Sequence, residues 1–532
     1  MRILDLLLVL MTVCAPIACG GRKHADSADS ATTPDGSTSE SHLDRFVGDE
    51  PIESSAELPN DTGLSDAGLE TASDGNASDR TEANSDGAPS EGPIEPMLAL
   101  TVASARVAGG NGSVTVAPEG TSCGSGCFLY RPGESVMLKA VPTSPSLFSG
   151  WSTDCQGQVT TSCTLVMSSK RMAVAHFRPN MNLMFVTSGR IAPGSIGANL
   201  AGGDAFCAKS ARDAYLGGTN WRAWLSTSPA TTNINAATHI GATTSGWLRI
   251  DGKPFAASMA ALLAGAIFYP PRITELGTDK SETYFVISAT KHDGTAHDNS
   301  SPGTNCADWT SAVGSPLGGD LRSTTVNWTN GTSVTNACGS SQSIYCFEND
   351  PEMVPIPLPS VPSNGRRAFL SSTLWAPGGG VESADAVCQS DAAAAQLPNS
   401  LDYRALLATM VPATDSSRIN LGGAPWFRLD GAQIVESATD LASSGAAKVL
   451  TTINVTSRKT YSDYFAVWTG SGNSPGTGTA RENCGNWQSA DALSMGWIGH
   501  VLTTGTYNTQ QLFWANGKNT CDLAAPIYCF QK

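Results

Sequence analysis

The sequence predicts an α+β protein in which one domain plan is written twice, after a small all-β domain and a disordered segment. Two observations support this prediction. The tetrapeptide Ile-Tyr-Cys-Phe stands at residues 344–347 and again at 527–530. The twelve cysteines beyond residue 100 fall into three groups of four, and the last two groups recur in the same order. With 532 residues, the chain is long enough for several domains, each with its own core.

The first residues, MRILDLLLVLMTVCAPIACGG, place Arg2 before an apolar run and small residues before Cys19. This pattern is typical of an export signal, and the apolar run is too short for a spanning helix. The small residue before the cysteine resembles a bacterial lipobox, which implies a lipoprotein signal peptide at residues 1–19 and lipidation of Cys19. Pro16 stands where lipoboxes usually carry Leu, so plain secretion is the alternative. The resemblance implies a lipid anchor in the bacterial envelope, with the outer membrane favoured and the surface or the periplasm as the side it faces.

Residues 20–98 are predicted to be a disordered acidic tether. From residue 22 to residue 98 there are 18 acidic and 4 basic residues, a net charge of −14. This segment has a single aromatic residue, Phe46, so it cannot bury enough apolar surface to fold. The rest of the chain keeps 29 of the 47 acidic and 28 of the 32 basic residues and is nearly neutral. Without a basic patch, no nucleic-acid partner is expected.

Residues 99–178 are predicted to form a small β-rich domain, which we call the N-terminal β domain. Short alternating segments at 113–116, 136–140 and 173–177 are separated by Gly and Pro. The order of G-x-G-x-V, C-x3-C, Y-x-x-G, F-x-G-W and V-A-H-F resembles the internalin B-type repeats of bacterial cell surfaces. Such repeats are mostly spacers or stalks, so the resemblance assigns no chemistry. Trp151 is interpreted as a core residue rather than a sugar-stacking platform, because the domain has few other large apolar groups.

Disulfides are the default state of the twelve cysteines in an exported chain. In the N-terminal β domain, Cys123 with Cys127 and Cys155 with Cys163 would close two short loops. Zinc is the alternative for the C-x3-C pair, but no paired histidines stand nearby.

The last two cysteine groups lie in residues 180–348 and 366–532, which we call the first copy and the second copy. Three motifs recur in order: D-A-x-C (204–207, 385–388), W-x-R-x-D-G (247–252, 426–431) and N-C-x-x-W (305–309, 483–487). Each copy starts with a predicted helix, at 201–216 and 384–397, and continues with short strands and long polar loops, which indicates an α+β domain. The Pro-rich residues 349–365 are predicted to be a semi-rigid linker.

The four cysteines of each copy, the first on an early helix and the last in a terminal strand, resemble the C-type lectin-like fold. In that family the first cysteine pairs with the fourth and the second with the third. The resemblance therefore implies four disulfides: Cys207–Cys346, Cys306–Cys338, Cys388–Cys529 and Cys484–Cys521. The motif order also resembles a domain of unknown function in leptospiral surface lipoproteins, including the endostatin-like group. The second copy departs from it at Leu406 and Gln531, where the first has Trp224 and Glu348.

Sugar-binding C-type lectins hold calcium through an E-P-N or Q-P-D loop and a W-N-D strand. Neither loop motif is present, and no carboxylate follows Asn330 or Asn516, which stand near the W-N-D position. Calcium takes about six to eight oxygen ligands, so these Asn-Gly pairs are interpreted as turns. No metal and no cofactor is expected. Asn330, Asn516 and Trp514 remain the candidate binding residues, with Trp375 and Trp497 as further candidates for contact.

No catalytic residues are predicted, because H-E-x-x-H and P-loop motifs are missing from the sequence. His292-Asp293 and His297-Asp298 could form an acid-base or metal cluster, but the second copy lacks them, so a solvated loop is favoured. The formylglycine-generating enzymes use a C-type lectin-like fold with a redox-available cysteine pair, whereas the structural pairing implied here leaves none.

The sequence is therefore interpreted as a non-catalytic cell-surface or envelope lipoprotein. It would bind a protein or glycan ligand through its two tandem lectin-like domains, as an adhesin or receptor does. The alternatives are a structural envelope scaffold without a ligand, and a formylglycine-type oxidase or another enzyme on the same fold.

Overall fold

The computed structural model describes residues 96–532 except 229–231, 282–284, 298–303, 334–336, 443–448, 474–475 and 508–509. The predicted signal peptide, Cys19 and the predicted tether up to residue 95 lie outside the described residues. The described part belongs to one compact unit, Ser90–Lys532. None of its helices combines the length and apolarity that a membrane crossing requires. Leu98, predicted to end the tether, instead begins the first strand.

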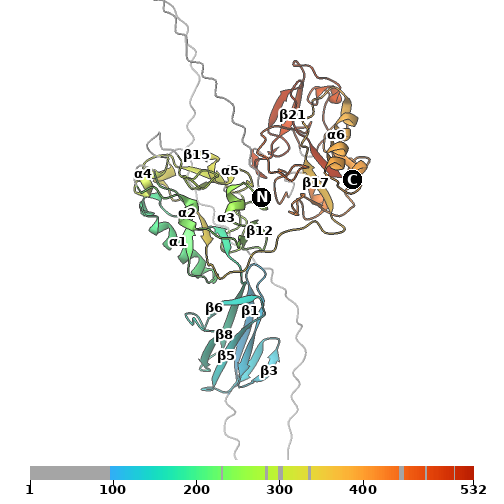
Figure 1. The fold of residues 1–532 in the computed structure, drawn as a ribbon. Coiled ribbons are helices and arrows are strands. Elements are labelled where there is room, and N and C mark those ends of the chain that lie inside the picture. The colour runs from blue at the N-terminus through green and yellow to red at the C-terminus, as the bar shows by residue number, and fades with distance from the viewer. Residues whose placement is uncertain are drawn as a thin grey trace, which may run out of the picture. The chain divides into compact units, whose positions relative to one another are not determined.

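The N-terminal β domain consists of two antiparallel-rich sheets packed face to face (Figure 1). One sheet has the order β3-β4-β1-β8-β6 and the other β2-β5-β7. The strands are β1 (Leu98–Arg106), β2 (Gly112–Ala117), β3 (Thr121–Gly124), β4 (Cys127–Tyr130), β5 (Ser135–Pro142), β6 (Ser146–Thr153), β7 (Ser162–Val166) and β8 (Arg171–Pro179).

Strict alternation of buried and exposed side chains explains how these short strands form a core. In β5 every second side chain is buried, beginning with Val136 and Leu138, while Met137 and its alternating partners face outward. Trp151 on β6 is 1 % exposed, and its indole N–H donates to the carbonyl oxygen of Thr160 at 3.0 Å. Trp151 is thus a core residue, as predicted.

The first copy is built on two small sheets, ordered β10-β16-β9-β11-β12 and β13-β14-β15. Its strands are β9 (Leu183–Val186), β10 (Trp221–Ala223), β11 (Trp247–Arg249), β12 (Pro254–Ala256), β13 (Phe285–Ile287), β14 (Leu317–Asp320), β15 (Thr332–Ser333) and β16 (Tyr345–Glu348). Its helices are α1 (Ala201–Asp213), α2 (Ala236–Ile240), α3 (Met259–Leu263), α4 (Cys306–Trp309) and α5 (Asn327–Asn330), with 3-10 turns at Pro193–Ser195 and Ala337–Gly339.

The second copy repeats this plan with sheets ordered β18-β25-β17-β19, β20-β21-β24 and β22-β23. Its strands are β17 (Arg366–Leu370), β18 (Tyr403–Ala405), β19 (Trp426–Phe427), β20 (Val467–Trp468), β21 (Met495–Gly499), β22 (Thr506–Tyr507), β23 (Gln510–Gln511), β24 (Gly517–Thr520) and β25 (Tyr528–Gln531). Its helices are α6 (Gly380–Ala394) and α7 (Cys484–Trp487), with 3-10 turns at Ser400–Asp402 and Ala438–Ala442. The two predicted early helices are therefore α1 and α6, each ending three residues sooner than expected.

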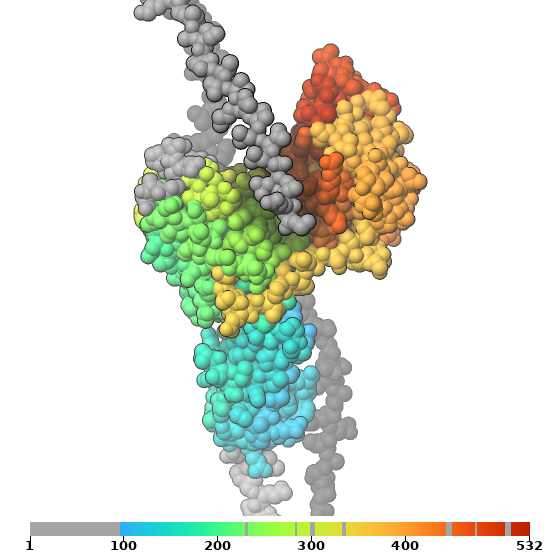
Figure 2. Space-filling model, in the orientation of Figure 1, coloured from blue at the N-terminus to red at the C-terminus, as the bar shows by residue number. Residues whose placement is uncertain are grey.

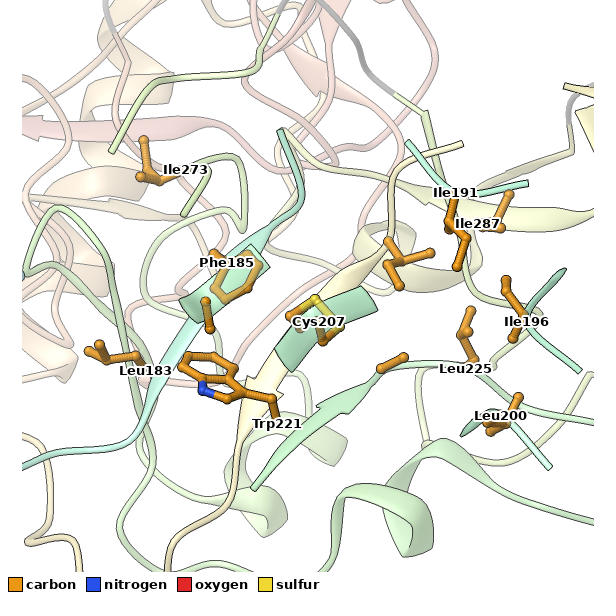
Figure 3. Packing of buried hydrophobic residues seen from close by; sticks show 14 of the residues in the cluster. Leu183, Phe185, Ile191, Ile196, Leu200, Cys207, Trp221, Leu225, Ile273 and Ile287 are labelled. Atoms are coloured by element: carbon orange, nitrogen blue, oxygen red, sulfur yellow. A yellow bond between two sulfur atoms is a disulfide. The ribbon is translucent and has the colours of Figure 1, made fainter. Parts of the chain in front are cut away.

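Six disulfides hold the described chain, and they use every cysteine beyond residue 95. The pairs are Cys123–Cys127, Cys155–Cys163, Cys207–Cys346, Cys306–Cys338, Cys388–Cys529 and Cys484–Cys521. The last four are the pairs that the lectin-like resemblance implies. In Figure 3, Cys207 lies inside the core of the first copy, with Phe185 and Trp221 on one side and Ile196 and Leu225 on the other.

The repeated D-A-x-C motif has a structural role in both copies. The Asp204 carboxylate accepts a hydrogen bond from the Ala223 N–H at 2.9 Å, and Asp385 accepts one from the Ala405 N–H at 2.8 Å. Each aspartate therefore ties the early helix to the strand that follows it, and the cysteine three residues later ties the same helix to the terminal strand.

The repeated N-C-x-x-W motif forms a single left-handed turn. The four residues Cys306–Trp309 have φ between +50° and +61°, a conformation that costs L-residues about 1–2 kcal/mol each. Asn305 stabilises the turn, because its side-chain oxygen accepts from the Asp308 N–H at 3.1 Å. The Trp309 indole donates to the carbonyl oxygen of Ser226 at 2.8 Å. The second copy repeats this geometry at residues 483–487.

The two copies contact each other through equivalent segments of the repeat. Arg428 donates to the carbonyl oxygen of Ile267 at 2.8 Å, and Thr451 donates to that of Phe268 at 2.6 Å. Phe268 also packs with Ala432 in a small buried cluster. These contacts combine backbone acceptors with buried side-chain donors, so they specify one orientation of the two copies.

The predicted linker, residues 349–365, lies against the first copy. The Val354 N–H donates to the Asn180 carbonyl oxygen at 3.1 Å, and the Ile356 N–H donates to that of Ser245 at 2.8 Å. Ile356 is 5 % exposed and belongs to the core of the first copy. Figure 2 shows this amber segment spread over green residues of the first copy.

Candidate functional site

The N-terminal β domain is joined to the first copy by a buried ion pair. Arg178, at the end of β8, donates to both carboxylate oxygens of Glu348 on β16, at 2.9 and 2.6 Å. The Arg178 side chain is 2 % exposed and the Glu348 side chain 0 %. Further donations from Arg178 reach the carbonyl oxygens of Leu216 at 3.0 Å and Met181 at 2.7 Å. Such a two-pronged contact fixes orientation as well as distance.

This pair explains why the closing strands of the two copies differ. Burial raises the pKa of Glu348, and the charge of Arg178 and the Leu183 N–H oppose that rise by holding the carboxylate. The second copy has no β domain directly before it and carries Gln531 at this position. There the side-chain oxygen of Gln531 accepts from the Arg367 N–H at 3.1 Å. A neutral amide suffices at this position, because its partner is a backbone N–H and not a guanidinium.

A second contact across the same junction is a stacked ring pair. The rings of His176 on β8 and Tyr215 after α1 lie 4.3 Å apart with an interplanar angle of 11°. His176 is also 2.9 Å from the Ser152 hydroxyl, and burial lowers the pKa of its imidazole. The residue equivalent to Tyr215 in the second copy is Gln396, which shares the left-handed backbone, with φ +55° against +56°. The aromatic ring is thus present only in the copy that meets the β domain.

Two glycines allow the close approach at this junction. Gly218 has φ +77°, and a Cβ atom there would lie 2.1 Å from the Glu348 carboxylate. Gly217 has φ +68°, and its Cβ would lie 3.2 Å from the Cβ of Ser149 on β6. The second copy has Pro398 and Asn399 at these positions. Only glycine satisfies both the backbone conformation and the space in the first copy.

Between these contacts the junction opens into a cleft of about 760 Å³, which we call the junction cleft. One wall comes from β6 and from the loop that the Cys155–Cys163 disulfide closes. The other comes from the end of α1 and the turn after it. The cleft is lined by Ser149, Gly150, Trp151, Gln156, Gly157, Gln158, Val159, Ala208, Arg212, Asp213, Tyr215, Gly217, Gly218 and Thr219.

The junction cleft combines polar groups of both hydrogen-bonding senses with aromatic surface. The Gln156 and Gln158 amides each both donate and accept, and they are exposed on the disulfide-closed loop. Arg212 and Asp213 add a donor and an acceptor from the last turn of α1. Tyr215 presents a partly exposed ring. A volume of this size lies within the range of about 300–1,000 Å³ that is typical of ligand pockets.

The candidate residues from the sequence lie elsewhere and do not come together. Trp514 is 0 % exposed, and its indole N–H donates to the Ser471 hydroxyl at 2.9 Å, so it is a core residue and offers no contact surface. Trp375 is 5 % exposed and is also core. Trp497 is half-buried beneath the Lys518 ammonium, 4.9 Å from its ring.

The two candidate asparagines each stand two residues after a buried tryptophan, Trp328 or Trp514. Asn330 ends α5, and its N–H donates to the Val326 carbonyl oxygen at 3.3 Å. The Asn516 N–H donates to the Ile498 carbonyl oxygen at 2.8 Å. Both side chains are half-buried. Across the described ranges, no three His, Cys, Asp or Glu side chains gather in a way that could hold a metal ion.

The Asp-Gly pairs of the repeated W-x-R-x-D-G motif form turns, and the arginines of the motif have a structural role. Gly252 and Gly431 have φ +80° and +90°. Arg249 pairs with Asp251 across the first turn, with Nε 3.0 Å from the carboxylate, and the second turn repeats the pair at 3.1 Å. Of the histidine loop, His292 is exposed, while Asp298 lies outside the described residues.

Sequence reasoning missed the junction cleft because the N-terminal β domain was interpreted as a spacer without chemistry. A signal was present in the differences between the two copies. Glu348 against Gln531, Tyr215 against Gln396, and Gly218 against Asn399 all concern residues that meet the β domain. Positions that change between otherwise matching copies mark surfaces on which only one copy has a neighbour.

Comparison with known proteins identifies the N-terminal β domain, which contributes one wall of the cleft. Residues 102–181 match the family model of the divergent InlB B-repeat domain. This confirms the bacterial surface-repeat resemblance of the N-terminal β domain. Among curated proteins, none matches the chain. The six disulfides fit an exported protein.

Proposed function

We propose that this chain is an exported, non-catalytic recognition protein of the bacterial envelope that binds a carbohydrate chain in the junction cleft. The observation that supports it most is the composition of the cleft walls, which bring together the two Gln amides, the successive side chains of Arg212 and Asp213, and the Tyr215 ring. Sugar hydroxyls both donate and accept hydrogen bonds, as the amide side chains do. The apolar face of a sugar ring suits a partly exposed aromatic ring.

The wider proposal keeps the interpretation drawn from the sequence. Both copies are proposed to have a C-type lectin-like fold, which the helix-to-terminal-strand disulfides Cys207–Cys346 and Cys388–Cys529 support. Acylation of Cys19 and anchoring to the outer membrane also remain part of the proposal. The proposed ligand site, however, is the junction cleft, of which the N-terminal β domain forms one wall and the first copy the other.

A glycan array with the full chain after signal removal tests this function, using Gln156→Ala/Gln158→Ala as the cleft variant. Losing two hydrogen bonds of about 0.5–1.5 kcal/mol each should weaken binding roughly five- to a hundredfold. Val159→Ala in the cleft and Leu493→Ala in the second copy form a matched pair, because these side chains are 91 % and 90 % exposed. Only the first should reduce binding.

The alternatives give different results in the same experiment. Binding that the cleft variants leave unchanged would place the ligand site elsewhere. A full array without any ligand would favour the scaffold. Thiol titration of the folded chain addresses the oxidase, because all twelve cysteines beyond residue 95 are paired and should give no free thiol.

A further inference from the structure

The first copy holds one of its own lysines in a pocket of backbone acceptors. The Lys280 ammonium donates to the carbonyl oxygens of Thr187 at 2.7 Å and Ser188 at 3.0 Å, and to the Ser343 hydroxyl at 2.5 Å. An ammonium has three donors, so this set of acceptors satisfies it completely. The pocket is therefore a built receptor for a primary ammonium.

The threonine and backbone hydrogen bonds around Lys280 form a frame that recurs at the equivalent position of the second copy. In the first copy the Thr274 and Thr278 hydroxyls lie 2.6 Å apart, and the Lys280 N–H donates to the Arg272 carbonyl oxygen at 2.9 Å. In the second copy the corresponding threonine hydroxyls, of Thr456 and Thr460, also lie 2.6 Å apart.

The backbone at the end of this frame identifies the residue that replaces the lysine. The Ser462 N–H donates to the Asn454 carbonyl oxygen at 2.8 Å, as the N–H of Lys280 does to that of Arg272. Ser462 thus stands where the first copy has Lys280. The short serine side chain does not reach the acceptors, and a pocket of about 190 Å³ lies at this place in the second copy.

Two of the three acceptors that hold Lys280 have counterparts in this pocket, while Pro526, which also lines it, stands where the first copy has Ser343. Ser371 is the counterpart of Thr187, because each hydroxyl accepts the N–H of the isoleucine before the closing strand, at 3.0 and 3.1 Å. Ser371 and Ser372 both line the pocket. Within the described residues, neither of their carbonyl oxygens receives a hydrogen bond. A polar acceptor pair that the first copy satisfies with an ammonium is thus available to an outside donor.

Each pocket has one carboxylate and one arginine nearby, although these groups come from different positions of the repeat. Glu275 accepts from the Ser188 N–H at 2.8 Å beside Lys280. In the second copy the Asp391 carboxylate, which is 7 % exposed, accepts from the Ser372 N–H at 2.6 Å. An arginine also acts on each pocket. Burial lowers the pKa of Lys280 and the charge of Arg190 lowers it further, while Glu275 opposes the shift. Arg458 lines the pocket of the second copy. The first copy shows that an ammonium is held with one arginine nearby.

The rim of the pocket suits the stem of a long side chain. Leu374 and Tyr464 line it and remain 47 % and 40 % exposed. Lysine packs its methylene stem on apolar surface while its head reaches polar groups, and an aromatic ring adds cation–π attraction. The compact ammonium fits a small pocket with converging carbonyls, whereas the planar guanidinium of arginine requires a wider fork of acceptors.

From these relations we infer that the pocket of Ser371, Ser372, Leu374, Ser462 and Tyr464 binds the side chain of a lysine exposed on a partner protein. The lysine would occupy in the second copy the place that Lys280 occupies in the first. This site is separate from the junction cleft and does not depend on the carbohydrate proposal.

A reciprocal exchange of the two residues tests the inference. The probe is N-acetyl-lysine N-methylamide, and capped norleucine, which has a similar stem without the ammonium, is its control. Binding is followed by saturation-transfer NMR on the full chain after signal removal. Wild type should bind the lysine probe at least about tenfold more tightly than capped norleucine. Ser462→Lys should abolish that preference by filling the pocket from within, and Lys280→Ser should add a second site.

A second Ser462 variant and a control variant in the junction cleft complete the test. Ser462→Met fills the pocket without a charge and should also remove binding, so the test does not depend on one variant. The cleft variant Gln156→Ala/Gln158→Ala should bind the probe as wild type does, which separates this site from the junction cleft. Equal binding of capped norleucine, or probe binding that survives both Ser462 variants, would overturn the inference.

Other sources of a cation are distinguished by two competing ligands. Potassium chloride, compared with tetramethylammonium chloride at equal ionic strength, tests for an alkali-ion site. Vesicles of phosphatidylethanolamine, compared with phosphatidylcholine, test for an amino-lipid headgroup. If either one binds in a Ser462-dependent manner while the lysine probe does not, the assignment to a lysine side chain is wrong.

Discussion

Arg178 and Glu348 form a two-pronged ion pair, with nitrogen–oxygen distances of 2.9 and 2.6 Å, although both side chains are almost completely buried. The pair links residues that are 170 positions apart in the chain. This pair holds the N-terminal β domain against the first copy, so that the domain forms one wall of the junction cleft. The cleft therefore depends on a contact between residues that belong to different domains in the sequence.

Glu348→Gln should destabilise the junction strongly, because it leaves the Arg178 guanidinium buried without a counter-charge. Breaking a buried pair by removing one partner costs about 3–5 kcal/mol. Calorimetry of the variant should show the N-terminal β domain unfolding at a lower temperature than in wild type. The paired change Arg178→Met/Glu348→Gln should recover most of the loss, since no buried charge remains. An unchanged transition in Glu348→Gln would contradict the role given to the pair.

Gly218→Ala should cost more than Gly277→Ala, although the two glycines have nearly the same φ, +77° and +76°. A left-handed alanine is strained by about 1–2 kcal/mol at either site. Only at Gly218 would the new Cβ meet an atom, 2.1 Å away in the Glu348 carboxylate, whereas nothing lies within 4 Å at Gly277. Denaturant unfolding should show the difference. Equal losses would mean that Glu348 moves freely and that the junction is loosely packed.

Stability should fall in mild acid because of His500. Burial lowers the pKa of this imidazole to about 4, while the nearby Asp320 charge opposes the shift. The unfolded chain has the ordinary histidine pKa of about 6.5 and binds the proton first. His500 therefore contributes full stability above about pH 6.5, and up to about 3 kcal/mol is lost as the pH falls towards 4.

Comparison of wild type with His500→Gln isolates this contribution. Glutamine keeps an acceptor for the Leu502 N–H, which donates to His500 Nδ1 at 3.3 Å. Denaturation midpoints between about pH 7 and pH 4 should decline less steeply in this variant. His292→Gln, at an exposed position, is the matched control and should follow wild type. Parallel profiles for all three proteins would rule out His500 as the source.

Removing the outer disulfide of the first copy should cost far more than removing the shortest one. Cys207 and Cys346 are 139 positions apart, while Cys123 and Cys127 are 4 apart. In the chain-entropy model these bonds contribute about 5 and about 2 kcal/mol. Paired alanine variants, compared by thermal unfolding under oxidising conditions, check the ranking. A larger loss for the short loop would show that strand pairing, not loop entropy, dominates in the β domain.

The repeat could be predicted because it is a periodic property of the sequence, whereas the disulfide pairing of the two copies was implied by the lectin-like resemblance. Helices α1 and α6 and the strands around β5 follow from hydrophobic spacing. The Asp251 and Asp430 turns follow from Asp-Gly chemistry. Exposure could not be predicted in the same way: Trp375 and Trp514 are core residues because they pack against helix and strand residues that are distant in the sequence.

The sequence by itself determined the order of the domains, the twofold repeat, the β character of residues 99–178 and which cysteines were available for pairing. Tertiary structure alone decided that Arg178 would meet Glu348, that Tyr215 would stack on His176, and that Ser462 would leave open the pocket that Lys280 fills. The physical reason is that periodicity and turn chemistry act between near neighbours in the chain. Clefts and ion pairs form where distant segments of the chain converge. The partner of a residue there can be identified only from the folded structure.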